Sequence, residues 1–275
     1  MTQIGFLGPY GTFSELAAKR WQSENPSFQT VPMPSLFDLF QALTEKEVST
    51  IIVPIENSIE GTVSTAIDLL TKHNDIFIIN EILLPVSHAL MAKEPMSLTD
   101  VKFVMSHPQP LAQCQTYLLK HLPQALTMTA KSTAQAAKDL TDPTTAIIGH
   151  QGLSEVYNLV TLDTNINDSK TNVTRFVVLS HNTTPPTGND KTSIVLSTTH
   201  NEPGSLVSIL QYFANQSINL TKIESRPTKV SLGHYLFFID FQGHTDDAEI
   251  QSVLKKIQPL SSTYKWLGSY PIDVS

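Results

Sequence analysis

Apolar strand segments alternate with helical patterns through residues 4–157, and this alternation constrains the fold more than any other feature of the sequence. The expected strand and helix pairs are residues 4–7 and 12–22, 50–54 and 62–72, 101–105 and 110–121, and 145–148 and 149–157. Such alternation is typical of an α/β fold with mostly parallel strands. Thr12-x-x-Glu15 and Ser132-x-x-Gln135 predict capping boxes at two of the helix starts.

The segment 181–190 reads as a linker, because it is dense in turn-forming residues and has no aliphatic side chain. After it, the expected strands are 191–199, 218–224, 235–241 and 262–270, and the expected helices are 203–215 and 246–257. This β-α-β-β-α-β order is the ferredoxin-like split βαβ pattern. The sequence therefore predicts two domains, at residues 1–181 and 190–275. The second should form a homodimer, because helices on one face of a sheet leave its edges and other face open; whether such dimers pair into tetramers stays open.

Composition excludes several classes of protein. Eighteen Lys and Arg against 25 Asp and Glu give a net charge of −7, the wrong sign for binding nucleic acid. Cys114 is the only cysteine, which excludes an internal disulfide and a thiolate cluster. No histidine lies within nine residues of another, and the G-x-G-x-x-G and G-x-x-x-x-G-K-[ST] motifs are absent, so we expect neither a metal nor a nucleotide cofactor. No membrane span or signal peptide is visible, which predicts a cytoplasmic protein without a membrane partner.

The chain has three arginines, Arg20, Arg175 and Arg226. Arg20 falls on the expected helix 12–22, where a solvated face is the simplest interpretation. Arg175 opens an apolar strand, where a guanidinium can bind a carboxylate through two hydrogen bonds. Arg226 ends a strand of the second domain. For Arg175 and Arg226, an internal ion pair is the alternative.

Four strand-to-helix junctions of the first domain carry hydroxyl or amide side chains, at residues 8–14, 56–62, 106–110 and 132–133. Free amides at helix starts bind anions, and in an α/β sheet such junctions gather at the carboxyl ends of the strands. Together they predict a small-anion site. The alternative is that Thr12, Thr62 and Ser132 are ordinary N-caps.

Two further candidates for acid and base chemistry are ambiguous. Glu56 and Glu60 have the spacing of a helical carboxylate pair, but the surrounding sequence looks like a turn. His107 could carry a proton at a strand end or be satisfied within its own loop. A Ser/His/Asp triad has no support from a G-x-S-x-G motif, which is absent.

Taken together, four motifs resemble the prephenate dehydratase family of phenylalanine biosynthesis. G-P-x-G-T-[FY]-[ST] is matched by residues 8–14, P-x-E-N-S-x-x-G by 54–61, S-H-P-Q-x-x-x-Q-C by 106–114, and T-R-F by 174–176. The second domain resembles an ACT domain, the regulatory module of that family. Ser205 replaces the usual Ala of its G-A-L motif, and Pro110 stands where the first domain often has Ala. No helical chorismate mutase pattern is visible before Gly5, so we expect the monofunctional arrangement.

The resemblance implies a catalytic domain of two lobes around a cleft, as in type II periplasmic binding proteins, and a decarboxylative dehydration of prephenate to phenylpyruvate without a cofactor. It assigns the acid role to Thr174, a substrate carboxylate to Arg175 and the pocket shape to Phe176. The substrate-binding residues that it implies are Thr12, Glu56, Asn57, Ser58, Gly61, Thr62, Ser106, His107 and Gln109.

The ACT resemblance implies allosteric binding of phenylalanine. The implied effector residues are Pro203, Gly204, Ser205, Leu206 and Val207 in one motif, and Glu224, Ser225, Arg226 and Pro227 in another. We expect phenylalanine to act on the catalytic lobes through the linker 181–190. The motifs do not separate prephenate from arogenate, the amino counterpart. Two rival functions are a small-anion sensor that signals through the ACT module and an interaction protein without activity.

Overall fold

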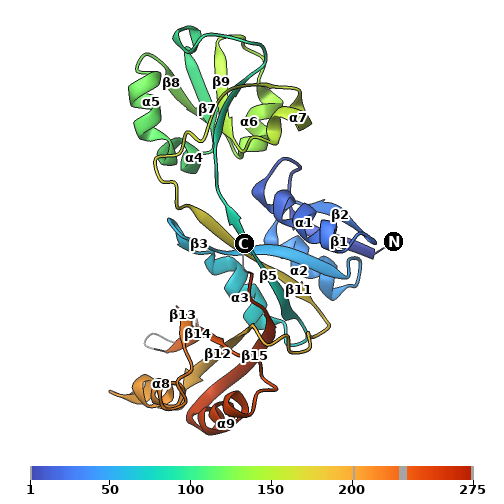
Figure 1. Cartoon of the computed structure of the whole chain (residues 1–275), viewed down its shortest axis with the longest axis vertical. Helices are drawn as coiled ribbons and strands as arrows, with labels where there is room; N and C mark the ends of the chain where they lie inside the picture. The colour runs from blue at the N-terminus through green and yellow to red at the C-terminus, as the bar shows by residue number, and fades with distance from the viewer. Residues whose placement is uncertain (1, 201, 229–233, 274–275) are drawn as a thin grey trace. The chain divides into compact units, whose positions relative to one another are not determined.

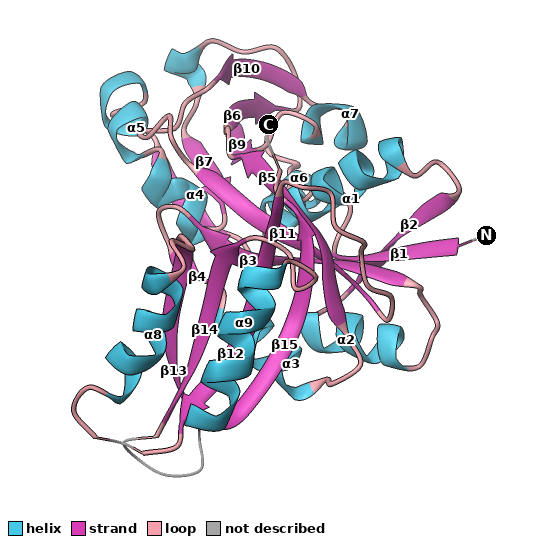
Figure 2. Ribbon diagram, turned by 60° about the horizontal axis from the view of Figure 1, so that its bottom comes forward, coloured by secondary structure: helices cyan, strands magenta, loops and turns pink. Residues whose placement is uncertain are grey.

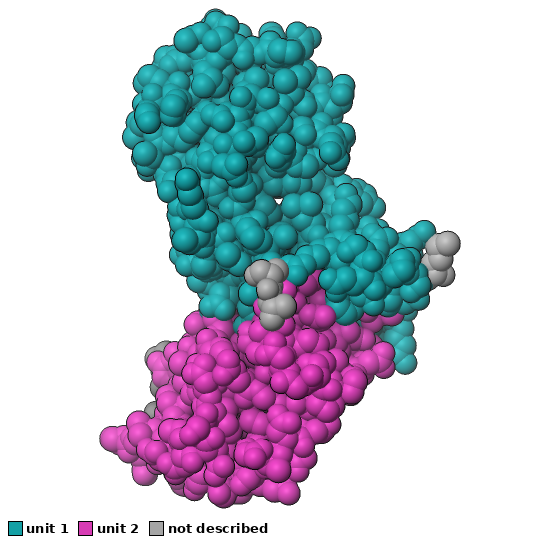
Figure 3. Space-filling view, in the orientation of Figure 1, with its two compact units in different colours: residues 1–48, 56–62, 83–176 teal, residues 49–55, 63–82, 177–275 magenta. Residues whose placement is uncertain are grey.

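The computed structural model describes residues 2–200, 202–228 and 234–273, and the fold of these residues is mixed α/β (Figure 1). They form three sheets, with the strand orders β2-β1-β3-β11-β5 (β4 paired to β3), β10-β6-β9-β7-β8 and β13-β14-β12-β15. By its contacts the chain divides into two compact units, residues 1–48, 56–62 and 83–176, and residues 49–55, 63–82 and 177–275 (Figure 3). No helix of the described residues is long and apolar enough to cross a bilayer.

The elements of the first sheet and its helices are β1 (Thr2–Leu7), α1 (Phe13–Glu24), β2 (Phe28–Met33), α2 (Leu36–Thr44), β3 (Thr50–Asn57), β4 (Gly61–Thr62), α3 (Ser64–Lys72), β5 (Phe77–Pro85) and β11 (Val173–Ser180). The predicted alternation is confirmed for β1 and α1 and for β3 and α3. Strands β2 and β5 and helix α2 were not part of the prediction. β1 and β2 pair in parallel, whereas β3 turns back on β4 as a hairpin.

The second sheet and its helices comprise β6 (Ala89–Ala92), β7 (Phe103–Ser106), α4 (Pro108–Gln113), α5 (Gln115–His121), β8 (Leu126–Thr129), α6 (Thr133–Asp139), β9 (Thr145–Gly149), α7 (Leu153–Tyr157) and β10 (Val160–Thr164), with a short 3-10 turn at Leu98–Asp100. β7 is parallel to β8 and β9, but β6 runs antiparallel to β9 and β10. The expectation of a mostly parallel sheet is therefore wrong for β6 and β10. No helix separates β5 from β6, and a parallel neighbour needs such a crossover.

Alternation along the strands gives the second sheet two apolar faces. Met91 and Ile147 pack with α6 on one face, and Leu90 and Ile148 pack with α5 on the other. Successive side chains of a strand point to opposite faces, so helices cover this sheet on both sides. The single helix predicted at residues 110–121 is two helices that meet at Cys114.

The third sheet has the predicted β-α-β-β-α-β order, in β12 (Asp190–Thr198), α8 (Ser205–Asn215), β13 (Leu220–Pro227), β14 (Tyr235–Gln242), α9 (Ala248–Ile257) and β15 (Ser261–Pro271), with a 3-10 turn at Gln258–Leu260. β14 pairs antiparallel with β12 and β13, and β12 with β15. Helices α8 and α9 lie along the strands (Figure 2) and pack on one face, where Phe213 and Ile257 join Ile194 and Phe241.

The other face of the third sheet is not open. Val195 and Phe238, which alternate with the residues under α8 and α9, line a cavity of about 130 Å³ together with Ile67 of α3. Lys265 on the same face donates hydrogen bonds to carbonyl groups at the C-terminal end of α3, those of Leu70 and His73 among them. The expectation of an uncovered face is therefore wrong, because α3 of the same chain occupies it; β13 lies at the edge of the sheet.

Candidate functional site

The tip of the β3–β4 hairpin fixes the amide of Asn57. Its Oδ1 accepts hydrogen bonds from the backbone N–H groups of Ile59 and Glu60, each at 3.0 Å. This is an Asx turn, in which a side-chain carbonyl replaces a backbone one. Gly61 closes the hairpin at φ +82°, a conformation that other residues rarely adopt. Because backbone N–H groups only donate, the Asn57 NH₂ group must face the other way.

That NH₂ group joins the hairpin to β11. Asn57 Nδ2 donates to Thr174 Oγ1 at 2.9 Å and to Asn172 Oδ1 at 2.8 Å. A hydroxyl that accepts a hydrogen bond keeps its own hydrogen to donate elsewhere. The structure therefore brings Asn57 and Thr174 together and leaves the Thr174 hydroxyl as a donor.

Ser58 fastens the same hairpin to the start of β11. Its backbone N–H donates to the Val173 carbonyl at 2.9 Å, and its hydroxyl accepts from the Val173 N–H at 2.9 Å. The hydroxyl also donates to the Thr171 carbonyl at 3.2 Å. These three bonds hold the register between Asn57 and Thr174.

Glu56 and Arg175 form a second pair on the opposite side of the two strands. Arg175 Nη1 lies 3.9 Å from Glu56 Oε2, and the arginine is only 7% exposed. Since neighbouring residues of a strand point to opposite faces, Thr174 and Arg175 diverge, as do Asn57 and Glu56. The internal ion pair considered for Arg175 is therefore present. Phe176 is fully buried on the Thr174 side.

Gln113, the last Gln of the S-H-P-Q-x-x-x-Q-C motif, extends the cluster. Its Oε1 accepts from Asn172 Nδ2 at 3.1 Å and lies 3.0 Å from His88 Nε2, while its Nε2 donates to Glu60 Oε1 at 3.4 Å. A cavity of about 270 Å³ adjoins it, lined by Ile59, Glu60, Ala112, Gln113, Asn167, Asp168, Ser169 and Asn172.

Sequence reasoning gave no role to Gln113, Asn172 or His88. A signal existed for Asn172, because it stands two residues before Thr174 and an extended chain puts such residues on one side. No local pattern distinguishes His88, which contacts the cluster only through the fold.

Two of the predicted junctions are plain helix caps. Thr12 Oγ1 accepts from the Glu15 N–H and donates to the Leu7 carbonyl, and Ser132 Oγ accepts from the Gln135 N–H. Thr62 is not an N-cap: it lies in β4, and α3 begins at Ser64 without a side-chain cap. The N-cap interpretation of Thr62 is wrong because the chain makes a hairpin before the helix starts.

The remaining predicted contacts are also local. Ser106 is fully buried, and its hydroxyl donates to the Ile148 carbonyl at 2.6 Å, which holds β7 to β9. His107 caps α4, where its Nδ1 accepts from the N–H of the exposed Gln109 at 3.4 Å. Among the described residues, no hydrogen bond joins Thr12, Ser106 or His107 to Asn57. Glu60 lies in the turn after β3, so the helical pair with Glu56 does not form.

Burial tunes the titratable groups near the cluster. Desolvation lowers the pKa values of His88 and His150, and it raises the pKa of the Cys114 thiol to about 12. Both imidazoles are therefore neutral near pH 7, and the thiol is not a nucleophile. Within the described ranges, no group of three or more His, Cys, Asp or Glu is placed to hold a metal ion.

The first predicted effector motif lies at the start of α8. Gly204 is the N-cap of that helix at φ +91°, a left-handed conformation that suits glycine. Ser205 and Leu206 line a cavity of about 620 Å³, whereas Val207 is 65% exposed. This cavity is larger than the cavity of about 130 Å³ that Arg226 and Pro227 of the second motif line.

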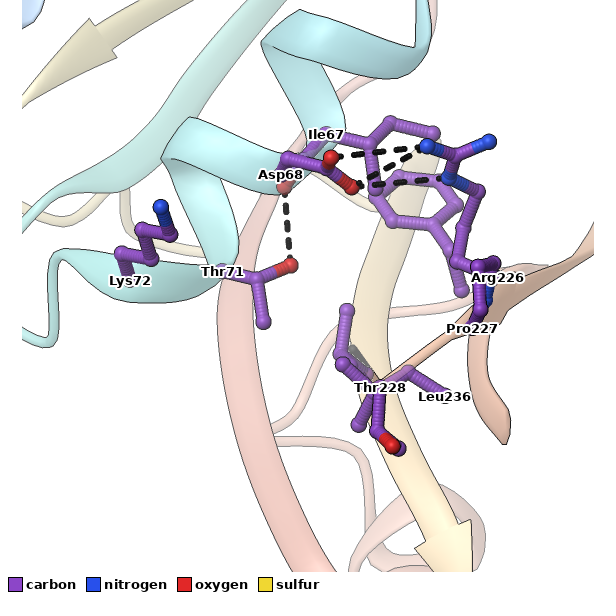
Figure 4. Close-up of a pocket in the computed structure, with 10 residues that line it drawn as sticks. Ile67, Asp68, Thr71, Lys72, Arg226, Pro227, Thr228 and Leu236 are labelled. Atoms are coloured by element: carbon purple, nitrogen blue, oxygen red, sulfur yellow. Dashed lines mark hydrogen bonds and ion pairs between the residues drawn. The ribbon is translucent and has the colours of Figure 1, made fainter. Parts of the chain in front are cut away.

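The second effector motif ends β13, where Arg226 forms an ion pair with Asp68 of α3. Nε and Nη2 of Arg226 lie 3.4 Å from the Asp68 carboxylate oxygens (Figure 4), and both side chains line the cavity of about 130 Å³ beside the third sheet. The internal ion pair considered for Arg226 is thus also present.

The sequence profile of the prephenate dehydratase family matches residues 4–184, and that of the ACT domain matches residues 192–258. The chain belongs to the prephenate dehydratase family. It is 38% identical over 271 residues to the prephenate dehydratase of Methanocaldococcus jannaschii, covering 96% of each chain. These matches confirm the family that the four sequence motifs indicate.

Solved structures confirm the fold of a prephenate dehydratase with an ACT domain. Prephenate dehydratase from Arthrobacter aurescens in complex with L-Phe superposes with a TM-score of 0.90 and 33% identity, covering 98% of this chain and 90% of that one. The structure of GqqA, described as a novel type of quorum quenching acylase, superposes with a TM-score of 0.88 and 25% identity over 99% of this chain and 98% of that one. A shared fold does not by itself fix the reaction, which depends on the residues of the site.

Proposed function

We propose that this chain is a prephenate dehydratase, a carbon–oxygen lyase that converts prephenate to phenylpyruvate, water and carbon dioxide in L-phenylalanine biosynthesis. The observation that carries the proposal is the hydrogen bond from Asn57 Nδ2 to Thr174 Oγ1. It leaves the hydroxyl of the T-R-F motif with a hydrogen to give, and departure of a ring hydroxyl needs such a donor.

The reaction breaks two bonds of the substrate ring. The bond between the ring and its carboxylate breaks, carbon dioxide leaves, and the electron pair moves into the ring. The bond to the ring hydroxyl breaks at the far side, and the oxygen leaves as water after taking a proton through the Thr174 hydroxyl, which solvent restores. The new aromatic ring supplies the driving force, so the reaction requires no cofactor.

Thr174 acts as a positioned donor rather than a strong acid. A free threonine hydroxyl is a weak acid, but a donor that is aligned before the reaction stabilises charge as it develops on the leaving oxygen. Asn57 supports this role by occupying a Thr174 lone pair, and Ser58 by holding the strand register.

Arg175 supplies the cation expected for a substrate carboxylate, and Phe176 shapes the pocket wall. Both residues follow Thr174 in the sequence of β11, with Phe176 on the same face and Arg175 on the opposite one, and the burial of both side chains supports their inclusion. The Glu56 pair gives Arg175 a second role, in fixing the guanidinium before substrate arrives. The remaining residues proposed to line the substrate site are Thr12, Glu56, Gly61, Thr62, Ser106, His107 and Gln109, to which the neighbours Asn172 and Gln113 are added.

We place the catalytic domain at residues 1–181 and the ACT domain at residues 190–275, and the profile matches at residues 4–184 and 192–258 support this order of two domains. The ACT domain pairs with a second copy in a homodimer, for which the edge strand β13 is the suitable element. The enzyme works in the cytoplasm.

Phenylalanine binds the ACT domain at residues 203–207 and 224–227 and regulates turnover. The L-Phe complex of the Arthrobacter aurescens relative supports this assignment. The Arg226–Asp68 pair adds a route: α3 carries Asp68 and begins two residues after the β3–β4 hairpin in the chain. A change at Arg226 is thus passed to the helix that follows Asn57.

The test is turnover by the purified chain. Prephenate is followed by phenylpyruvate absorbance with and without phenylalanine, and arogenate is supplied in parallel with phenylalanine as the product measured. We expect prephenate to be converted and phenylalanine to change the rate. Preferential turnover of arogenate would make the chain an arogenate dehydratase. No turnover of either by folded protein would overturn the proposal in favour of an anion sensor.

A further inference from the structure

We propose that His88 is a positioning residue for the Thr174 hydroxyl, acting through Gln113, Asn172 and Asn57. This inference rests on the proposed function of Thr174. His88 directly precedes β6, is 2% exposed, and places its Nε2 3.0 Å from Gln113 Oε1. No sequence motif of the site includes it.

The backbone fixes the direction of each hydrogen bond in the series from Asn57 through Asn172 to Gln113. Asn57 Oδ1 accepts from two backbone N–H groups, which cannot accept in return. Asn57 Nδ2 therefore faces Asn172, whose Oδ1 must accept at 2.8 Å. The Asn172 Nδ2 group is then the donor to Gln113 Oε1 at 3.1 Å.

The same logic selects one tautomer of His88. Because Gln113 Oε1 is an acceptor, the hydrogen between it and His88 must sit on Nε2. Burial lowers the pKa of His88, so the neutral ring has one N–H and its Nδ1 is bare. In agreement, His88 Nδ1 is buried and has no hydrogen-bond partner among the described residues.

The other tautomer would disturb the whole chain of bonds. A bare Nε2 would face Gln113 Oε1, so two acceptors would meet without a hydrogen between them. Turning the Gln113 amide would remove this repulsion, but it would set the Gln113 NH₂ group against the NH₂ group of Asn172. Turning Asn172 in response would set its NH₂ against that of Asn57, which the backbone prevents from turning. The Nε2–H form of His88 avoids this conflict, so Gln113 and Asn172 keep the amide orientations that the hydrogen bond from Asn57 requires.

The protein holds His88 in place through both its backbone and its ring. Its backbone N–H donates to Asn167 Oδ1 at 2.6 Å, and its carbonyl accepts from the Ile166 N–H at 3.1 Å. The ring of Phe13, from the G-P-x-G-T-[FY]-[ST] motif, meets the imidazole edge-on at 5.7 Å. These contacts fix the backbone of His88 and one edge of its imidazole beside Gln113.

His150 provides a matched control. It is also a buried histidine, and the centroid of its ring lies 5.3 Å from that of Phe13. Its Nδ1 accepts a hydrogen bond from the Gly152 N–H, and it makes no hydrogen bond to Gln113 among the described contacts. His88→Leu removes the donor, whereas His88→Gln keeps an N–H group near the Nε2 position. His150→Leu removes a similar buried ring away from the amide chain.

We expect His88→Leu to lower kcat by roughly 10- to 100-fold, the scale of a displaced catalytic group, with little change in KM. His88→Gln should recover most of that loss, and His150→Leu should reduce kcat much less at a comparable fall in Tm. Equal losses of kcat in the Leu and Gln variants of His88, or an unchanged kcat in His88→Leu, would overturn the proposal.

A measurement independent of activity separates this inference from the proposed function. Nitrogen-15 NMR of histidine-labelled full-length protein, with the His88 signals identified by their loss in His88→Gln, reports which ring nitrogen carries the hydrogen. We expect Nε2–H and a bare Nδ1 in the wild type. An Nδ1–H tautomer would overturn the inference whether or not the chain dehydrates prephenate.

Discussion

Asn57 Nδ2 donates to Thr174 Oγ1 across 2.9 Å, from the end of one strand to the second residue of another that lies 117 positions later in the chain. The bond has a direction, because the backbone N–H groups of Ile59 and Glu60 hold the Asn57 carbonyl on the other side. The Thr174 hydroxyl therefore keeps its hydrogen for an acceptor other than Asn57.

Asn57→Asp should reverse that direction at almost constant shape. The new carboxylate still accepts from the two backbone N–H groups, but it offers no hydrogen to Thr174 and draws the threonine hydrogen toward itself. We expect kcat to fall roughly 10²-fold, as measured by phenylpyruvate formation. Wild-type turnover in a variant that folds normally would show that the direction of this bond has no part in the reaction.

Arg175→Lys tests carboxylate recognition. A lysine keeps the charge but loses the planar fork, so it cannot hold Glu56 and a substrate carboxylate in the same geometry. We expect kcat/KM to fall roughly 10- to 100-fold, the equivalent of one hydrogen bond between charged groups. Unchanged kinetic constants would place substrate recognition on other residues.

The sequence predicted the parts of this site that depend on local pattern. Asn57, Ser58, Thr174 and Arg175 stand in short motifs, and β3, β11 and the ACT elements follow from apolar periodicity. What it could not predict are relationships set by strand pairing. The divergence of Thr174 from Arg175 follows from alternation in β11, and the ion pair with Glu56 needs the neighbouring strand.

Two other features that the sequence did not predict have equally specific causes. The antiparallel β6 was not predicted, because its four residues Ala89–Ala92 are too short to show a pattern and no helix precedes them. The cover of α3 over the third sheet depends on Lys265 and Arg226, which contact a helix more than 150 residues earlier in the chain. No local sequence pattern predicts a contact between residues so far apart in the chain.

Asp68→Asn tests the route from the ACT domain. Asp68 holds the Arg226 fork, and a carboxylate of the effector would have to compete for it. The variant should lower the phenylalanine concentration for half-maximal effect by up to about fivefold, since a partly exposed ion pair such as this contributes on the order of 1 kcal/mol. Thr65→Ala, an exposed change on the same helix, is the control. An unchanged response in Asp68→Asn would remove this pair from regulation.

Stability should fall on acidification because burial lowers the pKa values of His88 and His150 below 6.5. Below that pH the unfolded chain binds more protons than the folded one, so the free energy of unfolding decreases as pH falls through about 6.5 and is unaffected by these groups above it. The urea midpoint should drop between about pH 7.5 and about pH 5.5, and less so in a His88→Gln, His150→Gln double variant. An equal drop in the double variant would assign the acid sensitivity to other groups.

The most direct test of the whole account compares prephenate turnover by the wild type, Thr174→Val and Thr174→Ser. Valine preserves the shape and strand preference of threonine but has no hydroxyl, whereas serine keeps one. We predict that the valine variant loses roughly 10²- to 10⁴-fold in kcat, the range for a lost proton donor, and that the serine variant retains much of the activity. Near-normal phenylpyruvate formation by folded Thr174→Val would contradict the mechanism.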